Sequence, residues 1–194
     1  MGAARLASFN GVMSEVAPGV WVHRAAVVRS STIAGQGLFI TEPVPADEPL
    51  IRLGGRVVSN DQLIVLFERA NAQRRYVDTF AVDIDSHLVL PPDTRAHYAN
   101  HSCDPSMWLG APLELVARRD LPAGAELTID YGVISDDATF RMGCTCRATA
   151  CRRTVSGIDW QRADLRVTHH GRWPAGLQHH IDAAVASAER DAAL

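Results

Sequence analysis

Short apolar runs, separated by Gly and Pro turns, dominate the first two thirds of the sequence. Val, Ile and Leu are frequent in these runs, and the turns follow one another too closely for most helices. This pattern predicts a mainly β domain built from many short strands. The expected strands cover residues 21–28, 38–40, 50–53, 56–58, 79–84, 87–90, 113–117 and 127–131. We expect 50–53 and 56–58 to form a hairpin around Gly54 and Gly55.

Helical periodicity occurs once inside this pattern and again near the end of the chain. Ser59 is the predicted N-cap of a helix over residues 60–71. The buried stripe of that helix is expected to contain Leu63, Ile64, Phe67 and Ala70. Residues 159–169 predict a short helix that Gly171 ends, and Pro174 suits the first turn of another. The last helix carries an apolar stripe that either packs on the domain or forms a homodimer, made of Leu177, Ile181, Ala184, Val185 and Ala188.

Length and composition fit a soluble globular protein. A chain of 194 residues, 47% hydrophobic and 21% charged, can bury the core of one domain. The formal net charge of -3 argues against non-specific nucleic-acid binding, which usually needs a basic surface. No apolar run approaches the ~18 residues of a membrane helix, and residues 1–17 lack the apolar region of a secretory signal. We therefore expect a cytoplasmic protein with no membrane contact.

The basic residues are of a single type. All 19 are Arg, and the chain contains no Lys. This composition excludes mechanisms that need a lysine of the protein itself, such as a Schiff base or a P-loop. A GC-rich genome that favours Arg codons is the simplest explanation of the bias.

Four cysteines have a spacing that suggests a metal site. Cys144, Cys146 and Cys151 form a Cys-x-Cys-x₄-Cys cluster, and Cys103 lies 41 residues before it. Disulfides are disfavoured in the cytoplasm, and a closed structural zinc site takes four ligands, for which thiolates are suitable. Scattered free thiols remain an alternative. A redox pair is another, although the CxC spacing differs from the usual CxxC.

A polar run over residues 97–106, His-Tyr-Ala-Asn-His-Ser-Cys-Asp-Pro-Ser, has neither helical nor strand periodicity. Three other stretches accompany it, namely 35–39 (Gly-Gln-Gly-Leu-Phe), 126–132 (Glu-Leu-Thr-Ile-Asp-Tyr-Gly) and the cysteine cluster over 144–151. In this order, the four stretches resemble the SET-domain protein lysine methyltransferases that carry a post-SET zinc segment. The resemblance covers roughly residues 24–155.

The resemblance implies a SET-type fold of several short-stranded sheets with a pseudo-knot, one inserted helix and a C-terminal helical tail. The implied organisation is an N-terminal arm over residues 1–20, a SET domain over 21–139 with a helical insert at about 59–75, a post-SET zinc segment over 140–155, and C-terminal helices over 156–194. No cysteine cluster precedes the domain, so a pre-SET zinc module is not expected.

The resemblance also implies how the site is built. The backbone of Gly35, Gln36, Gly37 and Leu38 would cradle the methionine end of S-adenosylmethionine, with Asn100 and His101 on its other side. Tyr131 would contact the donor and act as the catalytic residue, while Asp130 is expected to be structural. One structural zinc would be held by Cys103, Cys144, Cys146 and Cys151. From the residues alone, the glycines could form a simple turn, and His101 and Tyr131 could be ordinary core residues.

The substrate in this interpretation is a protein or peptide lysine that enters a narrow channel. Candidate aromatic wall residues are Tyr76, Phe80, Tyr98 and Phe140, with core packing as the alternative role. The lysine amine would attack the donor methyl group directly after losing its proton. Its ordinary pKa of ~10.4 would be lowered by desolvation and by the nearby sulfonium charge. Two departures from the family pattern, His97-Tyr98-Ala99 before Asn100 and Ser106 after the proline, weaken any inference about histone substrates.

The expected function is S-adenosylmethionine-dependent methyl transfer to the ε-amine of a protein lysine, which gives S-adenosylhomocysteine and methyl-lysine. The alternatives are a non-catalytic SET-like module that binds peptide or cofactor beside a structural zinc, and a small zinc protein used only for docking. The paired histidines at 169–170 and 179–180 are expected to be solvated helix surface, because neighbours on a helix point in different directions.

Overall fold

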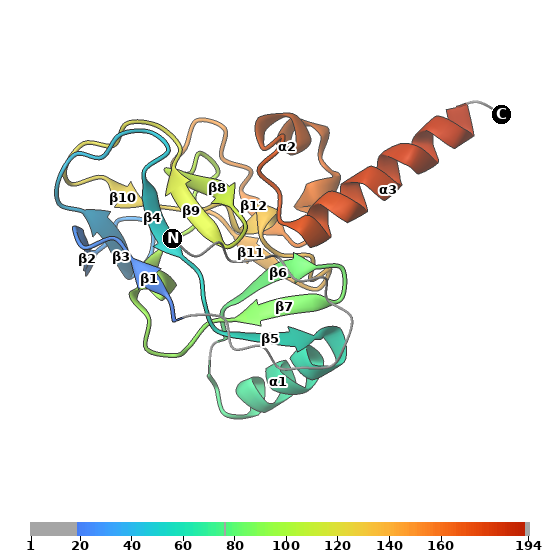
Figure 1. Cartoon of the computed structure of the whole chain (residues 1–194), viewed down its shortest axis with the longest axis horizontal. Helices are drawn as coiled ribbons and strands as arrows, with labels where there is room; N and C mark the ends of the chain where they lie inside the picture. Colours follow the sequence, from blue (N-terminus) through green and yellow to red (C-terminus); the bar gives the residue numbers. More distant parts are fainter. Residues whose placement is uncertain (1–18, 76, 193–194) are drawn as a thin grey trace, which may run out of the picture.

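Short antiparallel sheets form most of the structure, a computed structural model that describes residues 19–75 and 77–192 (Figure 1). Within these residues, the strand orders are β1-β4-β9-β8, β10-β3-β2, β5-β7-β6 and β11-β12. The strands are β1 (Trp21–Val22), β2 (Ala26–Ser30), β3 (Gln36–Ile40), β4 (Pro49–Arg52), β5 (Arg56–Ser59), β6 (Thr79–Asp83), β7 (Ser86–Val89), β8 (Met107–Ala111), β9 (Glu114–Ala117), β10 (Glu126–Leu127), β11 (Arg141–Gly143) and β12 (Thr154–Ser156). The predicted mainly β fold class is confirmed.

The predicted hairpin around Gly54 and Gly55 is wrong. β4 pairs with β1 and β9, whereas β5 pairs with β7 in a different sheet. The chain crosses between the two sheets at these glycines. Gly55 has φ +147, and a Cβ there would lie 2.1 Å from the carbonyl oxygen of Val89. The glycines therefore allow a close backbone crossing rather than a two-residue turn.

Helix α1 (Asn60–Ala72) begins as predicted. Ser59 and Gln62 form a capping box, in which the Gln62 N–H donates to Ser59 Oγ at 3.3 Å and the Ser59 N–H donates to Gln62 Oε1 at 3.1 Å. Leu63 and Ala70 are buried, but Ile64 is 57% exposed, so its predicted place in the buried stripe is wrong. Helix α1 packs mainly on β5 and β7, and this packing leaves Ile64 facing solvent.

The tail contains the short helix α2 (Ala163–Thr168) and the long helix α3 (Ala175–Ala192), connected through Gly171 at φ +71. Leu177 and Ile181 of α3 are buried, whereas Val185 is 41% exposed. The second half of α3 projects away from the body of the protein (Figure 1). The first half of the predicted apolar stripe therefore packs on the domain, and a homodimer through the second half stays a prediction.

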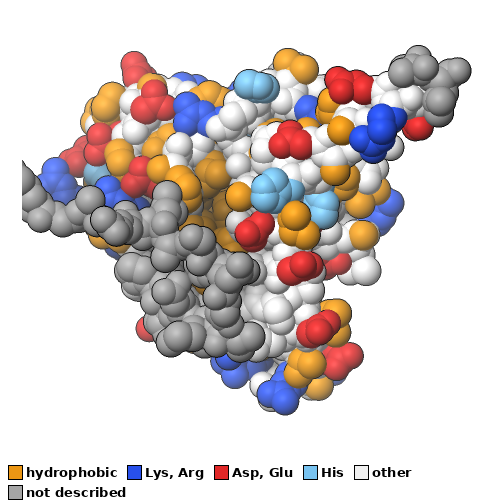
Figure 2. Space-filling model, turned by 45° about the vertical axis from the view of Figure 1, so that its right-hand side comes forward, with side chains coloured by type: hydrophobic (Ala, Val, Ile, Leu, Met, Phe, Trp, Pro, Cys, Tyr) orange, Lys and Arg blue, Asp and Glu red, His pale blue; other side chains and the backbone are white. Residues whose placement is uncertain are grey.

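The histidine pairs differ from the prediction at one position. His169 is only 1% exposed and packs edge-on against Trp173, so its predicted place on a solvated surface is wrong. His179 and His180 lie on α3 at 3.5 Å from Asp83 and 3.8 Å from Asp136, respectively. Figure 2 shows histidine and acidic side chains close together on this face. None of the described helices has both the length and the apolar character needed to cross a bilayer.

Two hydrophobic cores meet near the 3-10 helix η2 (Tyr131–Val133). The larger core fills the space between the sheets that contain β3, β4 and β9, and Tyr131 packs against its edge. The smaller core joins Val133 to residues of α2 and α3. The remaining 3-10 helices are η1 (Arg95–Tyr98) and η3 (Asp159–Gln161). The segment around Tyr131 is thus held between the domain and its tail.

Candidate functional site

The glycine loop, residues 35–38, covers the end of the β2–β3 connection and the start of β3. The Ser31 N–H donates to the Gly35 carbonyl at 2.9 Å, and Gly35 has φ +46, a left-handed conformation that favours glycine. A Cβ at Gly37 would lie 2.3 Å from Glu126 Oε1. The absence of a side chain at Gly37 therefore lets the Glu126 carboxylate lie directly against the loop.

Asn100 connects the polar run to this loop. Its Nδ2 donates to the carbonyl oxygens of Ala34 at 3.2 Å and Gln36 at 3.0 Å, and to Glu126 Oε1 at 2.8 Å. Ser31 Oγ donates to the same carboxylate at 2.8 Å. Sequence analysis expected these segments to meet, and the structure brings them together. The Asn100 side chain therefore orders the loop.

The polar run and the segment before Tyr131 pair in parallel. The Ile129 N–H donates to the Asn100 carbonyl at 3.0 Å, and the Ser102 N–H donates to the Ile129 carbonyl at 3.1 Å. This pairing explains why the expected strand over 127–131 ends early, at Leu127: Ile129 bonds with the polar run instead. The backbone then turns into η2 at Tyr131.

Tyr131 is fixed by two hydrogen bonds. Its hydroxyl donates to the Ala99 carbonyl at 2.9 Å, and its N–H donates to His101 Nδ1 at 3.2 Å. Because Nδ1 accepts, the ring proton of neutral His101 lies on Nε2. Burial lowers the pKa of His101 below its ordinary value, despite the opposing charge of Asp130, so the ring is neutral at pH 7.

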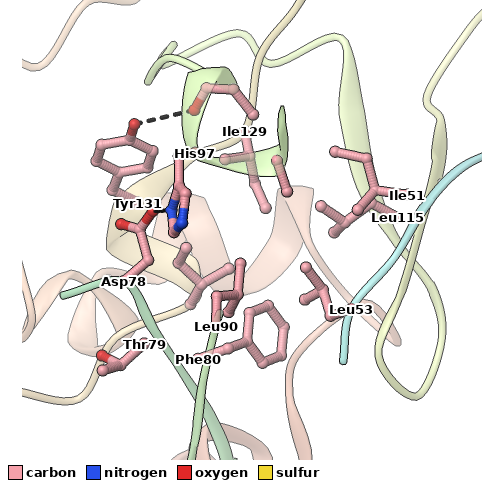
Figure 3. Close-up of a pocket in the computed structure, with 13 residues that line it drawn as sticks. Ile51, Leu53, Asp78, Thr79, Phe80, Leu90, His97, Leu115, Ile129 and Tyr131 are labelled. Carbon is pink, nitrogen blue, oxygen red and sulfur yellow. Dashed lines mark hydrogen bonds and ion pairs between the residues drawn. The ribbon is translucent and has the colours of Figure 1, made fainter. Parts of the chain in front are cut away.

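An apolar cavity opens beside Tyr131 (Figure 3), with an empty volume of about 470 Å³ including its mouth. The cavity proper is about 60 Å³, which is small for a ligand pocket. Most of the wall is aliphatic, with the aromatic rings of Phe80 and Tyr131 and an ion pair between Asp78 and His97. The lining residues are Ile51, Leu53, Asp78, Thr79, Phe80, Leu90, Ala96, His97, Ala99, Leu115, Ile129, Tyr131 and Ile134.

Only one of the described channel candidates lies in this cavity. Phe80 lines it, whereas Tyr98 is 37% exposed outside it and Phe140 is half-buried just before β11. Tyr76 lies outside the described residues. Sequence analysis missed the pairing of Asp78 with His97, because no local pattern connects residues 19 positions apart.

The four cysteines converge on one point. Cys144 Sγ lies 3.9 Å from Cys103 Sγ and 3.7 Å from Cys151 Sγ, and Cys146 Sγ lies within 4.8 Å of those of Cys103 and Cys144. Zinc–sulfur bonds of about 2.3 Å at tetrahedral angles separate two sulfur atoms by about 3.8 Å. The spacing of Cys103, Cys144 and Cys146 therefore fits three ligands of a zinc ion. The fourth member of the group of atoms that all lie within 4.8 Å of one another is His101, whereas Cys151 Sγ is close to Cys144.

His101 also lies at this cluster, with Nε2 3.3 Å from Cys103 Sγ. A protonated nitrogen has no lone pair for a metal. Because Nε2 carries the ring proton, His101 donates to the Cys103 sulfur rather than acting as a ligand. Cys151 as the fourth ligand stays a prediction.

The thiol pKa values indicate whether the four cysteines can all be thiolates without a metal. Burial raises the pKa of Cys103 to about 11 and also raises that of Cys144. Burial also acts to raise the pKa of Cys146, but the N–H groups of Cys103 and Ala148 outweigh it and lower the value to about 6. Four closely packed thiols do not all ionise by themselves, so a divalent cation is needed to stabilise the full thiolate set.

Comparison with known proteins gives a consistent result. Residues 35–132, about half of the chain, match the SET domain. The chain is 33% identical over 129 residues to "Probable histone-lysine N-methyltransferase lin-59" of Caenorhabditis elegans, covering 61% of this chain and 9% of that protein. It is 27% identical over 138 residues to "Probable histone-lysine N-methyltransferase set-23" of Caenorhabditis briggsae, covering 64% and 57%.

A human relative, "Histone-lysine N-methyltransferase 2B", is 30% identical over 142 residues, which is 66% of this chain and 5% of that protein. The chain thus spans at most 57% of these three relatives. The matched region contains the glycine loop, the polar run and Tyr131. The chain therefore belongs to the SET domain family.

Proposed function

We propose that this protein transfers a methyl group from S-adenosylmethionine to the ε-amine of a protein lysine, giving S-adenosylhomocysteine and methyl-lysine. One observation carries the proposal: Tyr131, fixed at its N–H and its hydroxyl, forms part of the wall of an apolar cavity and lies beside the polar run that holds the glycine loop. The relatives named as histone-lysine N-methyltransferases support the same reaction class.

The donor would be held by Gly35–Leu38, Asn100, His101 and Tyr131. Three acceptors, the carbonyls of Ala34 and Gln36 and the Glu126 carboxylate, converge on the two N–H groups of Asn100 Nδ2. The three acceptors outnumber the two N–H groups by one. The remaining acceptor suits the ammonium group of an amino-acid-like ligand. The bound donor supplies a methyl group activated by its sulfonium charge.

The cavity walls would prepare the substrate amine. Ile51, Leu53, Leu115 and Ile129 present only apolar surface, which disfavours a charged ammonium and lowers its pKa. The amine can attack only after losing this proton. The Tyr131 hydroxyl and the Ala99 carbonyl, which are hydrogen-bonded to each other, would orient the amine. The protein would then contribute mainly alignment and electrostatics.

The four cysteines would hold one structural zinc. Its role would be to tie residues 144–151 to the polar run through Cys103. Such a metal contributes folding free energy and takes no part in the methyl transfer itself.

Tyr131→Phe tests the catalytic role. The variant should bind S-adenosylhomocysteine with unchanged affinity, because the ring remains, but should lose about 100-fold or more in turnover, the usual cost of removing one aligned hydroxyl. Tyr98→Phe is the matched control, since it removes a hydroxyl from a tyrosine outside the cavity. The assay is mass spectrometry of a panel of histone and other lysine peptides. Unchanged turnover in Tyr131→Phe would refute the role.

The same panel separates the alternatives. Donor binding without a methylated product on any peptide would indicate a non-catalytic peptide- or cofactor-binding module. No donor binding at all would indicate a zinc protein used for docking. A screen of cell lysate with labelled donor would identify the substrate protein, and the cytoplasmic location stays a prediction.

A further inference from the structure

A buried arginine next to the last cysteine connects the zinc segment to the turn that contains Tyr131. The Arg152 Nη1 and Nη2 atoms donate to the two carboxylate oxygens of Asp130 at 2.7 and 2.6 Å, and Nε donates to Asp159 at 3.1 Å. The three side chains are only 6%, 0% and 9% exposed. Such a two-pronged, fully desolvated ion pair fixes both position and orientation.

The carboxylate of Asp130 in turn fixes the turn around Tyr131. Asp130 precedes Tyr131, and its Oδ1 also accepts the Gly132 N–H at 3.0 Å. A Cβ at Gly132 would lie 2.7 Å from Asp159 Oδ2 and 3.1 Å from Arg152 Nη2. The turn is therefore packed directly against the arginine and its second carboxylate.

A second route starts at Cys103. Its sulfur accepts from the Arg152 N–H at 3.4 Å and lies 3.3 Å from His101 Nε2, while His101 Nδ1 accepts the Tyr131 N–H. Two sets of contacts thus run from the cysteine cluster to the turn around Tyr131. One passes through the His101 ring to the Tyr131 N–H, and the other through the buried ion pairs to the Gly132 N–H.

We propose that Arg152, which lies in the segment held by the cysteine cluster, is a positioning residue that fixes the Tyr131 turn through Asp130. The proposal rests on the proposed methyl transfer. Its physical basis is the cost of a buried unpaired charge. If residues 144–152 separate from the domain on metal loss, Asp130 loses its counter-ion while still fully buried, and the turn over 130–132 must rearrange.

The test compares Arg152→Lys with Arg153→Lys in the full zinc-loaded chain. Both changes introduce one lysine and keep the charge, but only Arg152 has a buried side chain, whereas Arg153 is exposed. A lysine ammonium is a point charge and cannot bridge two carboxylates as the guanidinium does. The measurements are zinc content, binding of S-adenosylhomocysteine, kcat and KM on a lysine peptide, and backbone hydrogen exchange over residues 128–134.

For Arg152→Lys we expect one zinc per chain, donor affinity and KM within about 3-fold of wild type, kcat reduced by about 10- to 100-fold, and exchange of the Tyr131 and Gly132 amides at least about 10-fold faster. Arg153→Lys should match wild type in every measurement. Unchanged exchange and kcat in Arg152→Lys would overturn the proposal. Joint loss of zinc, donor binding and exchange protection throughout the chain would also overturn it, because Arg152 would then only support the fold.

A measurement on wild type covers the case in which Arg152→Lys does not fold. Removing zinc with a chelator should speed hydrogen exchange over residues 128–134 before it affects β4 and β9. The proposal would be overturned if exchange over 128–134 became faster only together with exchange in these strands, or after it. If wild type methylates no lysine peptide, the proposed function fails. Zinc content and hydrogen exchange then still decide whether Arg152 positions the turn.

Discussion

A methyl group added at Gly37 tests the contact between the glycine loop and Glu126. In Gly37→Ala the new Cβ would lie 2.3 Å from Glu126 Oε1, 2.9 Å from its Cδ and 3.0 Å from Ser31 Cβ. The backbone of Gly37 is not in the left-handed region, so alanine adds no conformational strain there. The carboxylate must therefore move away from the loop.

The cost follows from the hydrogen bonds that the moving carboxylate gives up. Glu126 accepts from Ser31 Oγ at 2.8 and 3.0 Å and from Asn100 Nδ2 at 2.8 Å. Hydrogen bonds to a charged group contribute about 1.5–3 kcal/mol each when buried, and these are half-buried, so about 1 kcal/mol per donor is appropriate. Losing both donors should lower the free energy of unfolding by about 2 kcal/mol.

A double-mutant cycle isolates this contact. Glu126→Ala loses the same bonds and should also cost about 2 kcal/mol, but the double variant should cost about 2 rather than 4 kcal/mol, because the collision is gone. The assay is urea unfolding of the four proteins. Gly19→Ala is the control, since a Cβ at that glycine meets no atom within 4 Å. Additivity of the two changes to within about 0.5 kcal/mol would refute the reasoning.

Three further predictions concern the metal, a buried histidine and a helix cap. Cys103→Ser should abolish stoichiometric zinc binding, as measured by metal analysis of reduced protein; two zinc ions or none in wild type would contradict the four-thiolate site. Burial lowers the pKa of His169, so the unfolded chain binds a proton that the folded chain excludes, and stability should fall as the pH drops below ~6.5, by at most ~1.4 kcal/mol per unit. His169→Phe should remove that part of the loss between pH 7 and 5 in urea unfolding, and identical pH slopes would argue against it. Ser59→Ala should lower the free energy of unfolding by about 1 kcal/mol, because it removes the capping box with Gln62, and a change below about 0.3 kcal/mol would count against the cap.

Local chemistry made part of the structure predictable. The helix α1 begins where Ser59 and Gln62 place it, because a cap is decided by residues three positions apart. The approach of Cys103 to Cys144 and Cys146 was also predictable, because a CxC pair and a distant cysteine in a polar run are typical of a metal site. In both cases one energetic term dominates, and that term can be recognised from residue types and spacing.

Long-range pairing was not predictable in the same way. The exchange of partners at Gly55 depends on the Val89 carbonyl, which lies on another strand. The pairs of Asp78 with His97 and of Asp130 with Arg152 join residues 19 and 22 positions apart in segments without a shared period. A sequence pattern identifies charged residues, but it does not say which of them become each other's counter-ion after folding.

The buried charge at Asp130 also shows how far the functional unit extends. The matched SET region ends at residue 132 and includes Tyr131, but the counter-ion of Asp130 is Arg152, which Asp159 holds from its other side. A buried carboxylate that loses a paired cation costs about 3–5 kcal/mol, a large fraction of the stability of a small domain. The turn at Tyr131 is therefore stable only together with the cysteine segment and η3. In this protein the segment after the matched region is a structural part of the site that it follows.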